Sequence, residues 1–328
     1  MKIYEKYDTI TTFDDKIFYK NNLILSCLSA NKFELYKNNS KREIDFYYEK
    51  YKPNRKLIRL KNIFIFIFNR GKQSAGNFFH FHFHYLQRIL GFFLLNDKNL
   101  KLGIPLNMTP FQKNIILRLI PENKIIYLDI YKYNYRIKNC YVGNYININS
   151  IPDFLLDKYQ IIGHEIIYNN YIKSKYENNI FISRKINDNA GSNRYITNYD
   201  IFLKLLESKK FKLFYFEDYT LENKLIKLLS LNPKLILIEN GSGLTNFLFM
   251  PKNILKNIHL IILDQEKWKI KTSRIYDIIL KFEIKHDILT CKNIINDKVD
   301  IRNNPFSVDI CEFEKIYNNS ANSLIHSS

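Results

Sequence analysis

Several features that mark particular classes of protein are scarce or absent in this sequence. The chain has only four cysteines, scattered without a C-x-x-C pair, which favours reduced thiols over a disulfide framework or a cysteine-based zinc site. Its opening segment, MKIYEKYDTITTFDDK, lacks the apolar core of a signal peptide. The longest apolar run, residues 78–94, is interrupted by three His, a Gln and an Arg, so it does not qualify as a transmembrane helix. We therefore expect a soluble, cytoplasmic protein.

Length and composition indicate a globular protein of two domains. A chain of 328 residues exceeds the size at which single cores stop growing, and 46% hydrophobic residues are enough for packed interiors. Lysines and arginines outnumber aspartates and glutamates by 50 to 32, a net charge of +18. Such a charge is typical of proteins that bind nucleic acid, anionic membranes or phosphorylated ligands. The abundance of Lys, Asn, Ile and Tyr indicates that coding bias supplies part of it.

Strand-like and helix-like apolar segments alternate along most of the chain, the pattern of a parallel sheet with helices on its faces. In the first half we predict strands at 62–68, 100–105 and 124–130, and helices at 111–120 and 151–163. In the second half we predict strands at 179–185, 211–216, 234–239 and 259–264, and helices at 199–209, 220–230 and 244–249. The fold class is therefore α/β, with two Rossmann-like domains at 1–165 and 166–328. Residues 1–60 are hard to interpret.

The most informative segment is LILIENGSGLTNFLFMP, residues 235–251, which has the order strand, glycine turn, helix. Gly241 and Gly243 can adopt positive φ and let another molecule approach the backbone closely. The first N–H groups of the helix face the same space, which favours an anionic group such as a phosphate or diphosphate. The alternative is a turn that only reverses the chain.

A second segment, NFFHFHFHYLQR at residues 77–88, permits two interpretations. As a strand, its alternation would place His80, His82 and His84 on one face, as in some metal sites. As a helix, its aromatic and leucine residues form one apolar stripe, and His80 and His84 share a face. The helical pattern continues to Leu94, whereas the strand pattern stops at Tyr85. We therefore predict a helix.

These segments together carry a family resemblance. The blocks ISRK, RYITNYD, FYFEDYTLENKL and ILIENGSGLTNFLFMP resemble, in this order, the C-terminal half of glycosyltransferase family 61, an inverting family that uses nucleotide sugars. The block from Asn77 to Arg88 looks like that family's N-x-x-H-(F/W)-x-x-(D/E)-x-L-x-R. The resemblance implies a GT-B-like arrangement, in which two domains face each other across a cleft. It also implies a C-terminal domain that binds the nucleotide sugar and an N-terminal domain on the acceptor side.

Donor-binding residues follow from the same resemblance. Arg184, Lys185 and Arg194 match the family's basic motif and would stabilise the departing diphosphate. Glu217 matches a family Glu and would accept a hydrogen bond from a ribose hydroxyl. No Asp-x-Asp stands where a strand ends, so we expect no metal and no cofactor besides the nucleotide-sugar co-substrate. The backbone N–H groups of the glycine turn would assist, and the residues concerned are Asn240, Gly241, Ser242, Gly243, Leu244, Thr245 and Asn246.

On the acceptor side, His80 matches the family's His, and either His80 or His84 would be the catalytic base. His84 stands where the family has an acidic residue, and Asn240 stands where a His is common. These two departures leave open a relative that has lost its activity. Asn77 and Arg88 complete the motif.

The expected partners are a nucleotide sugar and a glycan or lipid-linked acceptor, with peripheral contact to an anionic membrane and no nucleic acid. Two other classes of function stay open. A nucleic-acid-binding protein would use the charge together with 24 Tyr and 25 Phe, although the aromatic residues lie mostly inside apolar runs. A metalloprotein would use the three histidines of the segment 77–88.

Overall fold

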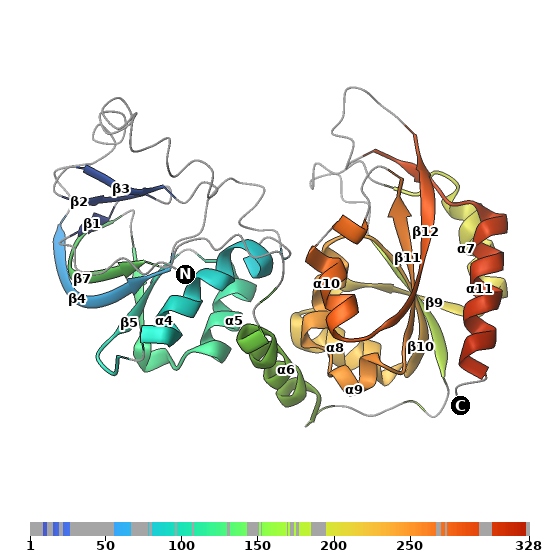
Figure 1. Ribbon diagram of the computed structural model, residues 1–328, viewed down its shortest axis with the longest axis horizontal. Coiled ribbons are helices and arrows are strands. Elements are labelled where there is room, and N and C mark those ends of the chain that lie inside the picture. The colour runs from blue at the N-terminus through green and yellow to red at the C-terminus, as the bar shows by residue number, and fades with distance from the viewer. Residues whose placement is uncertain are drawn as a thin grey trace. The chain divides into compact units, whose positions relative to one another are not determined.

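The computed structural model describes residues 9–11, 16–19, 22–26, 56–66, 78, 81–95, 97–106, 108–129, 132–142, 151, 153–168, 170, 174, 177–184, 195–266, 270–272, 274–294 and 304–325. The chain divides into two compact units, Met1–Leu155 and Leu156–Ser328 (Figure 1). Each unit holds one sheet. No helix among the described residues is long and apolar enough to cross a membrane.

Unit 1 is built on a seven-stranded sheet with the order β3-β2-β1-β7-β4-β5-β6. The pairs β7-β4, β4-β5 and β5-β6 are parallel, whereas β3, β2, β1 and β7 join by antiparallel pairs. The mainly parallel sheet predicted for this half is therefore found only from β7 to β6. The strands are β1 (Thr9–Thr11), β2 (Lys16–Tyr19), β3 (Asn22–Ser26), β4 (Leu57–Ile65), β5 (Lys101–Pro105), β6 (Ile125–Leu128) and β7 (Asn134–Val142).

Helices in unit 1 follow the predicted positions. α5 (Pro110–Leu119) begins with a proline, where the missing N–H is not needed, and the N–H of Thr109 donates to Gln112 Oε1 over 2.9 Å. The histidine-rich segment is helical throughout η2 (Phe81–Tyr85), η3 (Leu86–Ile89) and α4 (Leu90–Leu95). The helix prediction is thus confirmed for residues 81–95, and the strand interpretation is wrong there, since His82 and His84 lie in a helical turn.

Unit 2 contains a six-stranded sheet with the order β13-β12-β11-β10-β8-β9, parallel except for the β12-β13 pair. From β8 the chain first adds β9 on one side and then returns to add β10, β11 and β12 on the other. The direction of winding therefore reverses between β8 and β10. The strands are β8 (Asn178–Ser183), β9 (Phe211–Tyr215), β10 (Pro233–Glu239), β11 (His259–Gln265), β12 (Lys285–Asn293) and β13 (Phe306–Ser307).

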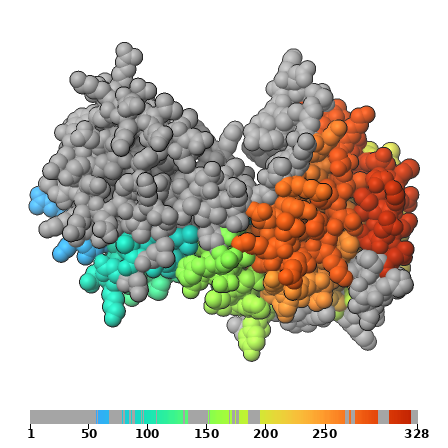
Figure 2. Space-filling view, viewed as in Figure 1, coloured from blue at the N-terminus to red at the C-terminus, as the bar shows by residue number. Residues whose placement is uncertain are grey.

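Helices cover both faces of this sheet, which explains why every residue of β11 is buried. α7 (Tyr199–Ser208) and α11 (Ile310–Ile325) lie on one face, and α8 (Leu221–Ser230), α9 (Lys252–Leu255) and α10 (Arg274–Lys281) lie on the other (Figure 1). Thr220 caps α8, because its Oγ1 accepts a hydrogen bond from Asn223 N over 3.3 Å. α11 lies at the surface of unit 2, in red in Figure 2.

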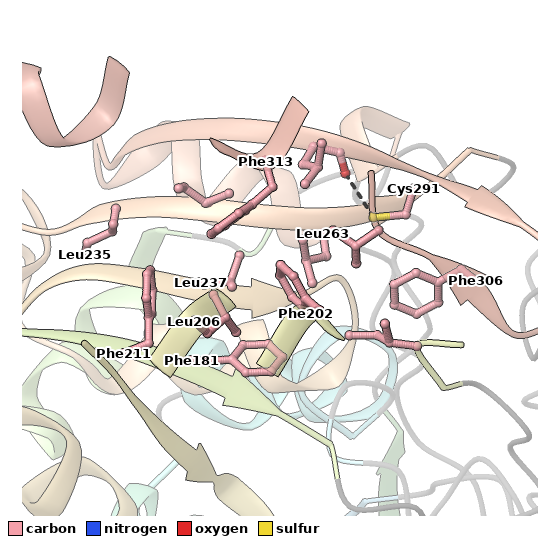
Figure 3. Packing of buried hydrophobic residues seen from close by; sticks show 14 residues of the cluster. Phe181, Phe202, Leu206, Phe211, Leu235, Leu237, Leu263, Cys291, Phe306 and Phe313 are labelled. Atoms are coloured by element: carbon pink, nitrogen blue, oxygen red, sulfur yellow. Dashed lines mark hydrogen bonds between the residues drawn. The ribbon is translucent and has the colours of Figure 1, made fainter. Parts of the chain in front are cut away.

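The core under α7 and α11 is rich in aromatic residues (Figure 3). Phe202 of α7 meets Phe313 of α11 edge to face, with ring centroids 5.1 Å apart. Cys291, a buried free thiol, donates to the carbonyl oxygen of Leu289 over 3.5 Å. This cluster joins α11 to the sheet, although α10, β12, β13 and α11 were not predicted from the sequence.

α6 (Asp153–Tyr168) belongs to unit 2 from Leu156 onward. The side-chain amide of Gln160 donates to the carbonyl oxygens of Leu248 and Met250 over 2.8 and 3.0 Å. A Cβ atom at Gly163 would stand 1.7 Å from the carbonyl oxygen of Phe249, so only glycine permits this approach. The domain boundary predicted from the sequence, 165/166, falls after most of this helix.

Candidate functional site

The reversal of winding places the carboxyl ends of β8 and β10 side by side. Ile182 pairs with Ile238, so Ser183 and Arg184 leave β8 beside Glu239, where β10 ends. In open parallel sheets the connections from two such strands run in opposite directions and leave a crevice at their carboxyl ends, where ligands bind. We call this place, defined by Ser183, Arg184 and residues 239–243, the switch point.

Gly241 gives the switch point its sharp turn. Its φ of 153° and ψ of −159° lie in a region that is essentially restricted to glycine. Among the described glycines only Gly241 has a positive φ. A Cβ atom at Gly243 would make ordinary contacts, 3.5 Å from Phe216 Cδ2 and 3.6 Å from Ile238 Cδ1. The fold therefore requires glycine at position 241 but not at position 243.

The helix that follows the turn is η6 (Ser242–Phe249), a 3-10 helix and not an α-helix. Its first N–H groups have no acceptor in the preceding turn of helix, as at any helix N-terminus. Ser242 and Gly243 are half exposed, whereas the next residues are buried. Ser242 and Gly243 are therefore the two residues of the helix start that a ligand can reach. The buried residues are Leu244, Thr245 and Asn246.

The buried side chain of Asn246 holds the turn by a hydrogen bond to its backbone. Its Nδ2 donates to the carbonyl oxygen of Gly243 over 2.8 Å. Its Oδ1 and the hydroxyl of Thr245 are buried and have no hydrogen-bond partner within the described part of the chain. Two buried polar atoms without a described partner thus lie in η6, within five residues of Gly241.

Arg184 provides a cation at the switch point. Its backbone N–H donates to Glu239 Oε1 over 3.2 Å, and the side chain is half exposed. Within the described ranges, its guanidinium forms no ion pair or side-chain hydrogen bond. An arginine held by its backbone and free at its head group can bind an anion without first breaking an internal contact.

Glu239 belongs to the switch point, although it was not predicted from the sequence as a site residue. It is 5% exposed, and its Oε1 also accepts a hydrogen bond from Ser183 Oγ over 3.3 Å. Its Oε2 is buried and has no partner among the described residues. Glutamate is almost never fully buried unless it is paired. The signal in the sequence was a carboxylate that ends the apolar run LILI and directly precedes the glycine turn.

Two phenols stand beside this carboxylate. The hydroxyls of Tyr199, at the start of α7, and Tyr215, at the end of β9, are 3.3 Å apart. Burial, followed by the hydrogen bond with Tyr215, raises the pKa of Tyr199 to about 12, while a hydrogen bond with Ser183 acts in the opposite direction. Tyr199 therefore stays protonated and can donate a hydrogen bond at physiological pH.

Asn240 holds the end of β10 to the end of β11. Its Nδ2 donates to Asp264 Oδ1 over 2.7 Å, and Asp264 Oδ2 accepts from the N–H of Ile270 over 2.8 Å. Glu217 lies in η5 (Phe216–Asp218), just after β9, and is exposed. No described hydrogen bond or ion pair joins Glu217 to the switch point. The donor-binding roles of both residues stay predictions.

The remaining predicted residues are only partly described. Asn77, His80, Lys185 and Arg194 lie outside the described residues. The backbones of His84 and Arg88 are helical, but their side chains are not described. His84 belongs to a π-helical turn, a rare conformation found frequently at functional sites.

His82, the middle histidine of the segment, is fully buried between aromatic rings. Its ring centroid lies 4.5 Å from that of Phe78 and 5.2 Å from that of Phe81. Burial lowers the pKa of His82 to about 3, so the imidazole is neutral at physiological pH. In the described parts of the chain, no three His, Cys, Asp or Glu residues are grouped so that they could hold a metal ion.

Comparison with known proteins adds one finding. Residues 78–255, more than half of the chain, match the family described as Glycosyltransferase 61. The match begins within the histidine-rich segment and includes the whole switch point. No curated protein matches the chain.

Proposed function

The chain belongs to glycosyltransferase family 61, and from that premise we propose that it transfers a sugar, with inversion, from a nucleoside diphosphate to a glycan hydroxyl. The observation that carries this proposal is the switch point of unit 2. There a glycine-only turn, the half-exposed start of a helix and an arginine whose guanidinium has no partner among the described residues come together. A nucleotide diphosphate is the anion that suits these groups.

The chemistry places two demands on the chain. As the bond from the anomeric carbon to the diphosphate oxygen breaks, negative charge grows on the diphosphate. The Arg184 guanidinium and the N–H groups of Ser242 and Gly243 would stabilise this charge, and fixed donors are effective because they need no reorganisation during the reaction. Lys185 and Arg194 would add positive charge.

The second demand is a base that takes the proton of the acceptor hydroxyl while its oxygen attacks the opposite face of the sugar. We assign this role to His80 or His84, because an imidazole exchanges protons near neutral pH. His82 does not suit the role, since burial holds its pKa at about 3. Glu217 would accept a hydrogen bond from the ribose, and Asn77 and Arg88 would complete the acceptor side.

Unit 2 would hold the donor and unit 1 the acceptor, in a GT-B-like arrangement of the two. Fixed cations would replace a divalent metal, so transfer would be metal-independent and need no cofactor. The acceptor would be a glycan or a lipid-linked sugar, reached from the cytoplasm. The net charge of +18 would support loose contact with an anionic membrane at about 1 kcal/mol per well-placed cation. Salt-sensitive sedimentation with anionic vesicles tests this contact, and an absence of binding at low salt would contradict it.

The proposal as a whole is tested by a thermal-shift screen of nucleoside diphosphates and nucleotide sugars, repeated in excess EDTA. A ligand present at 100 times its Kd should stabilise the protein by about 2.7 kcal/mol. We expect stabilisation by one nucleotide series, unchanged by EDTA. Stabilisation by none of them contradicts a nucleotide-sugar donor. Stabilisation that EDTA abolishes and manganese restores contradicts metal independence.

A further inference from the structure

We propose that Glu239 is a specificity-determining residue of the donor site, whose free carboxylate oxygen accepts a hydrogen bond from a sugar hydroxyl of the bound nucleotide sugar. This inference rests on the proposed function and deepens it. The resemblance from which the other donor residues were predicted assigned no role to Glu239.

The carboxylate is held in place by one of its two oxygens. Oε1 accepts from Ser183 Oγ over 3.3 Å and from the N–H of Arg184 over 3.2 Å, so β8 fixes the orientation of a side chain that comes from β10. Oε2 is buried and has no partner in the described part of the molecule. Leaving a buried acceptor unsatisfied is costly, and such an atom in a native protein calls for a water or a ligand group to complete it.

The position of Glu239 selects the kind of group that binds. Glu239 lies only three residues before Ser242, where the diphosphate would meet the start of η6. A carboxylate repels phosphate, so its partner must be a hydrogen-bond donor attached close to the diphosphate. A nucleotide sugar carries such donors on both sides of the diphosphate, namely the ribose hydroxyls and the hydroxyls of the transferred sugar.

The neighbours of Glu239 also suit a polyhydroxylated ligand. The hydroxyl of Ser183 donates to Glu239, and the negative charge of Glu239 contributes to the raised pKa of Tyr199, whose hydroxyl lies 3.3 Å from that of Tyr215. A bound metal ion is a poorer fit, because among the described residues Glu239 belongs to no group of three or more His, Cys, Asp or Glu that could hold one.

Glu239→Gln tests the inference directly. Glutamine keeps an oxygen for Ser183 and Arg184 but replaces Oε2 with an amide that cannot accept a hydrogen bond. The probes are UDP, ADP, GDP and CDP, their 2′-deoxy forms and the corresponding nucleotide sugars, measured by calorimetry. The matched control is Lys212→Ala, an exposed residue in the middle of β9.

If the ribose is the partner, wild type should bind the 2′-deoxy form of its nucleotide about 10- to 100-fold more weakly, and Glu239→Gln should bind both forms alike. If the transferred sugar is the partner, Glu239→Gln should bind the nucleoside diphosphate normally and the nucleotide sugar about 10- to 100-fold more weakly. Lys212→Ala should match wild type in both arms.

Unchanged binding of all three ligands by Glu239→Gln would overturn the inference while leaving the proposed function intact. Wild type that binds no nucleotide contradicts the proposed function itself. If the Glu239→Gln variant fails to fold, the affinities of wild type for the three ligands provide the test. Equal affinity for the ribose form, the 2′-deoxy form and the nucleotide sugar would then overturn the inference.

Discussion

In the parallel sheet of unit 2, the polar residues at the two ends of the strands differ in their hydrogen bonding. We call the side where the strands begin the amino edge and the side where they end the carboxyl edge. At the amino edge, His259 Nε2 lies 2.7 Å from Asp287 Oδ2, which also accepts from Ser320 Oγ over 2.7 Å. At the carboxyl edge, polar atoms of Glu239, Thr245 and Asn246 are buried without a partner among the described residues. The amino edge has one such atom in this region, His259 Nδ1.

This difference separates stability from binding. The amino-edge contacts tie α11 to β11 and β12, so they stabilise the fold and offer little to a ligand. At the carboxyl edge, buried polar atoms have no partner among the described residues, which costs stability and provides binding capacity, as is common at functional sites. Variants at the amino edge should therefore change unfolding, and variants at the carboxyl edge should mainly change nucleotide binding.

Lowering the pH should have the largest effect on the free energy of unfolding. The pH range of this effect determines the pH at which variants of the two edges should be compared. His82 in unit 1 has a pKa of about 3 when folded and about 6.5 when unfolded, so between these values the unfolded state binds more protons. Stability contributed by the neutral imidazole is present above pH 6.5. It falls by about 1.4 kcal/mol per pH unit as the pH drops toward 3.

Urea unfolding of wild type and His82→Leu between pH 4 and 8 measures this acid effect, with the variant expected to show a flatter dependence. An equally steep loss in both proteins would show that another group dominates. Edge variants should be compared above pH 6.5, where the contribution of the neutral His82 imidazole is fully present.

Asp287→Ala should have the next largest effect, because it removes the shared acceptor of the amino edge. Hydrogen bonds to charged groups contribute about 1.5 to 3 kcal/mol. Because the Asp287 side chain is 42% exposed, water competes for these bonds and their contribution is smaller than that of two buried ones. We therefore expect a loss of about 2 to 3 kcal/mol in the free energy of unfolding. Nucleotide affinity should stay at the wild-type value. Weakened nucleotide binding by a folded Asp287→Ala protein would contradict the claim that the amino edge affects stability and not binding.

The two glycines of the turn form a matched pair with a smaller effect on stability. Gly241→Ala forces a side chain into a glycine-only conformation, which costs about 1 to 3 kcal/mol, so both stability and binding should fall. Gly243→Ala meets only ordinary contacts, so its unfolding free energy should stay within about 0.5 kcal/mol of wild type. If a diphosphate approaches this backbone, Gly243→Ala should still bind nucleotide more weakly. Full affinity in Gly243→Ala would place the diphosphate elsewhere.

Local patterns in the sequence predicted much of this edge. The run LILIE, the glycine turn and the segment after it are recognisable as strand, turn and helix because each depends on neighbouring residues. The order of the strands depends on pairing between distant segments, so the reversal between β8 and β10 could not be read from periodicity. The strand KHDILTCKN was missed because polar residues interrupt its apolar pattern.

Site residues were predictable to a smaller degree. Arg184 was predicted because it belongs to a motif that resembles the family's, and the structure places it directly after β8, while its donor-binding role stays a prediction. The partners of Glu239 come from β8, 55 and 56 positions away along the chain, so its buried, half-paired state is visible only in the folded chain. The same holds for the need for glycine at position 241 but not at 243, which depends on the space beside Phe216 and Ile238.

The central claim, that the carboxyl edge at β8 and β10 holds a nucleotide diphosphate, is tested most directly by calorimetric titration of Arg184→Ala with the nucleoside diphosphate that wild type binds. Loss of a charge-assisted contact of about 1.5 to 3 kcal/mol should weaken binding by about 10- to 150-fold, with an unchanged unfolding free energy. Lys212→Ala, which removes one positive charge from the same unit, should bind as wild type does. An Arg184→Ala protein that binds the diphosphate with wild-type affinity would contradict the account.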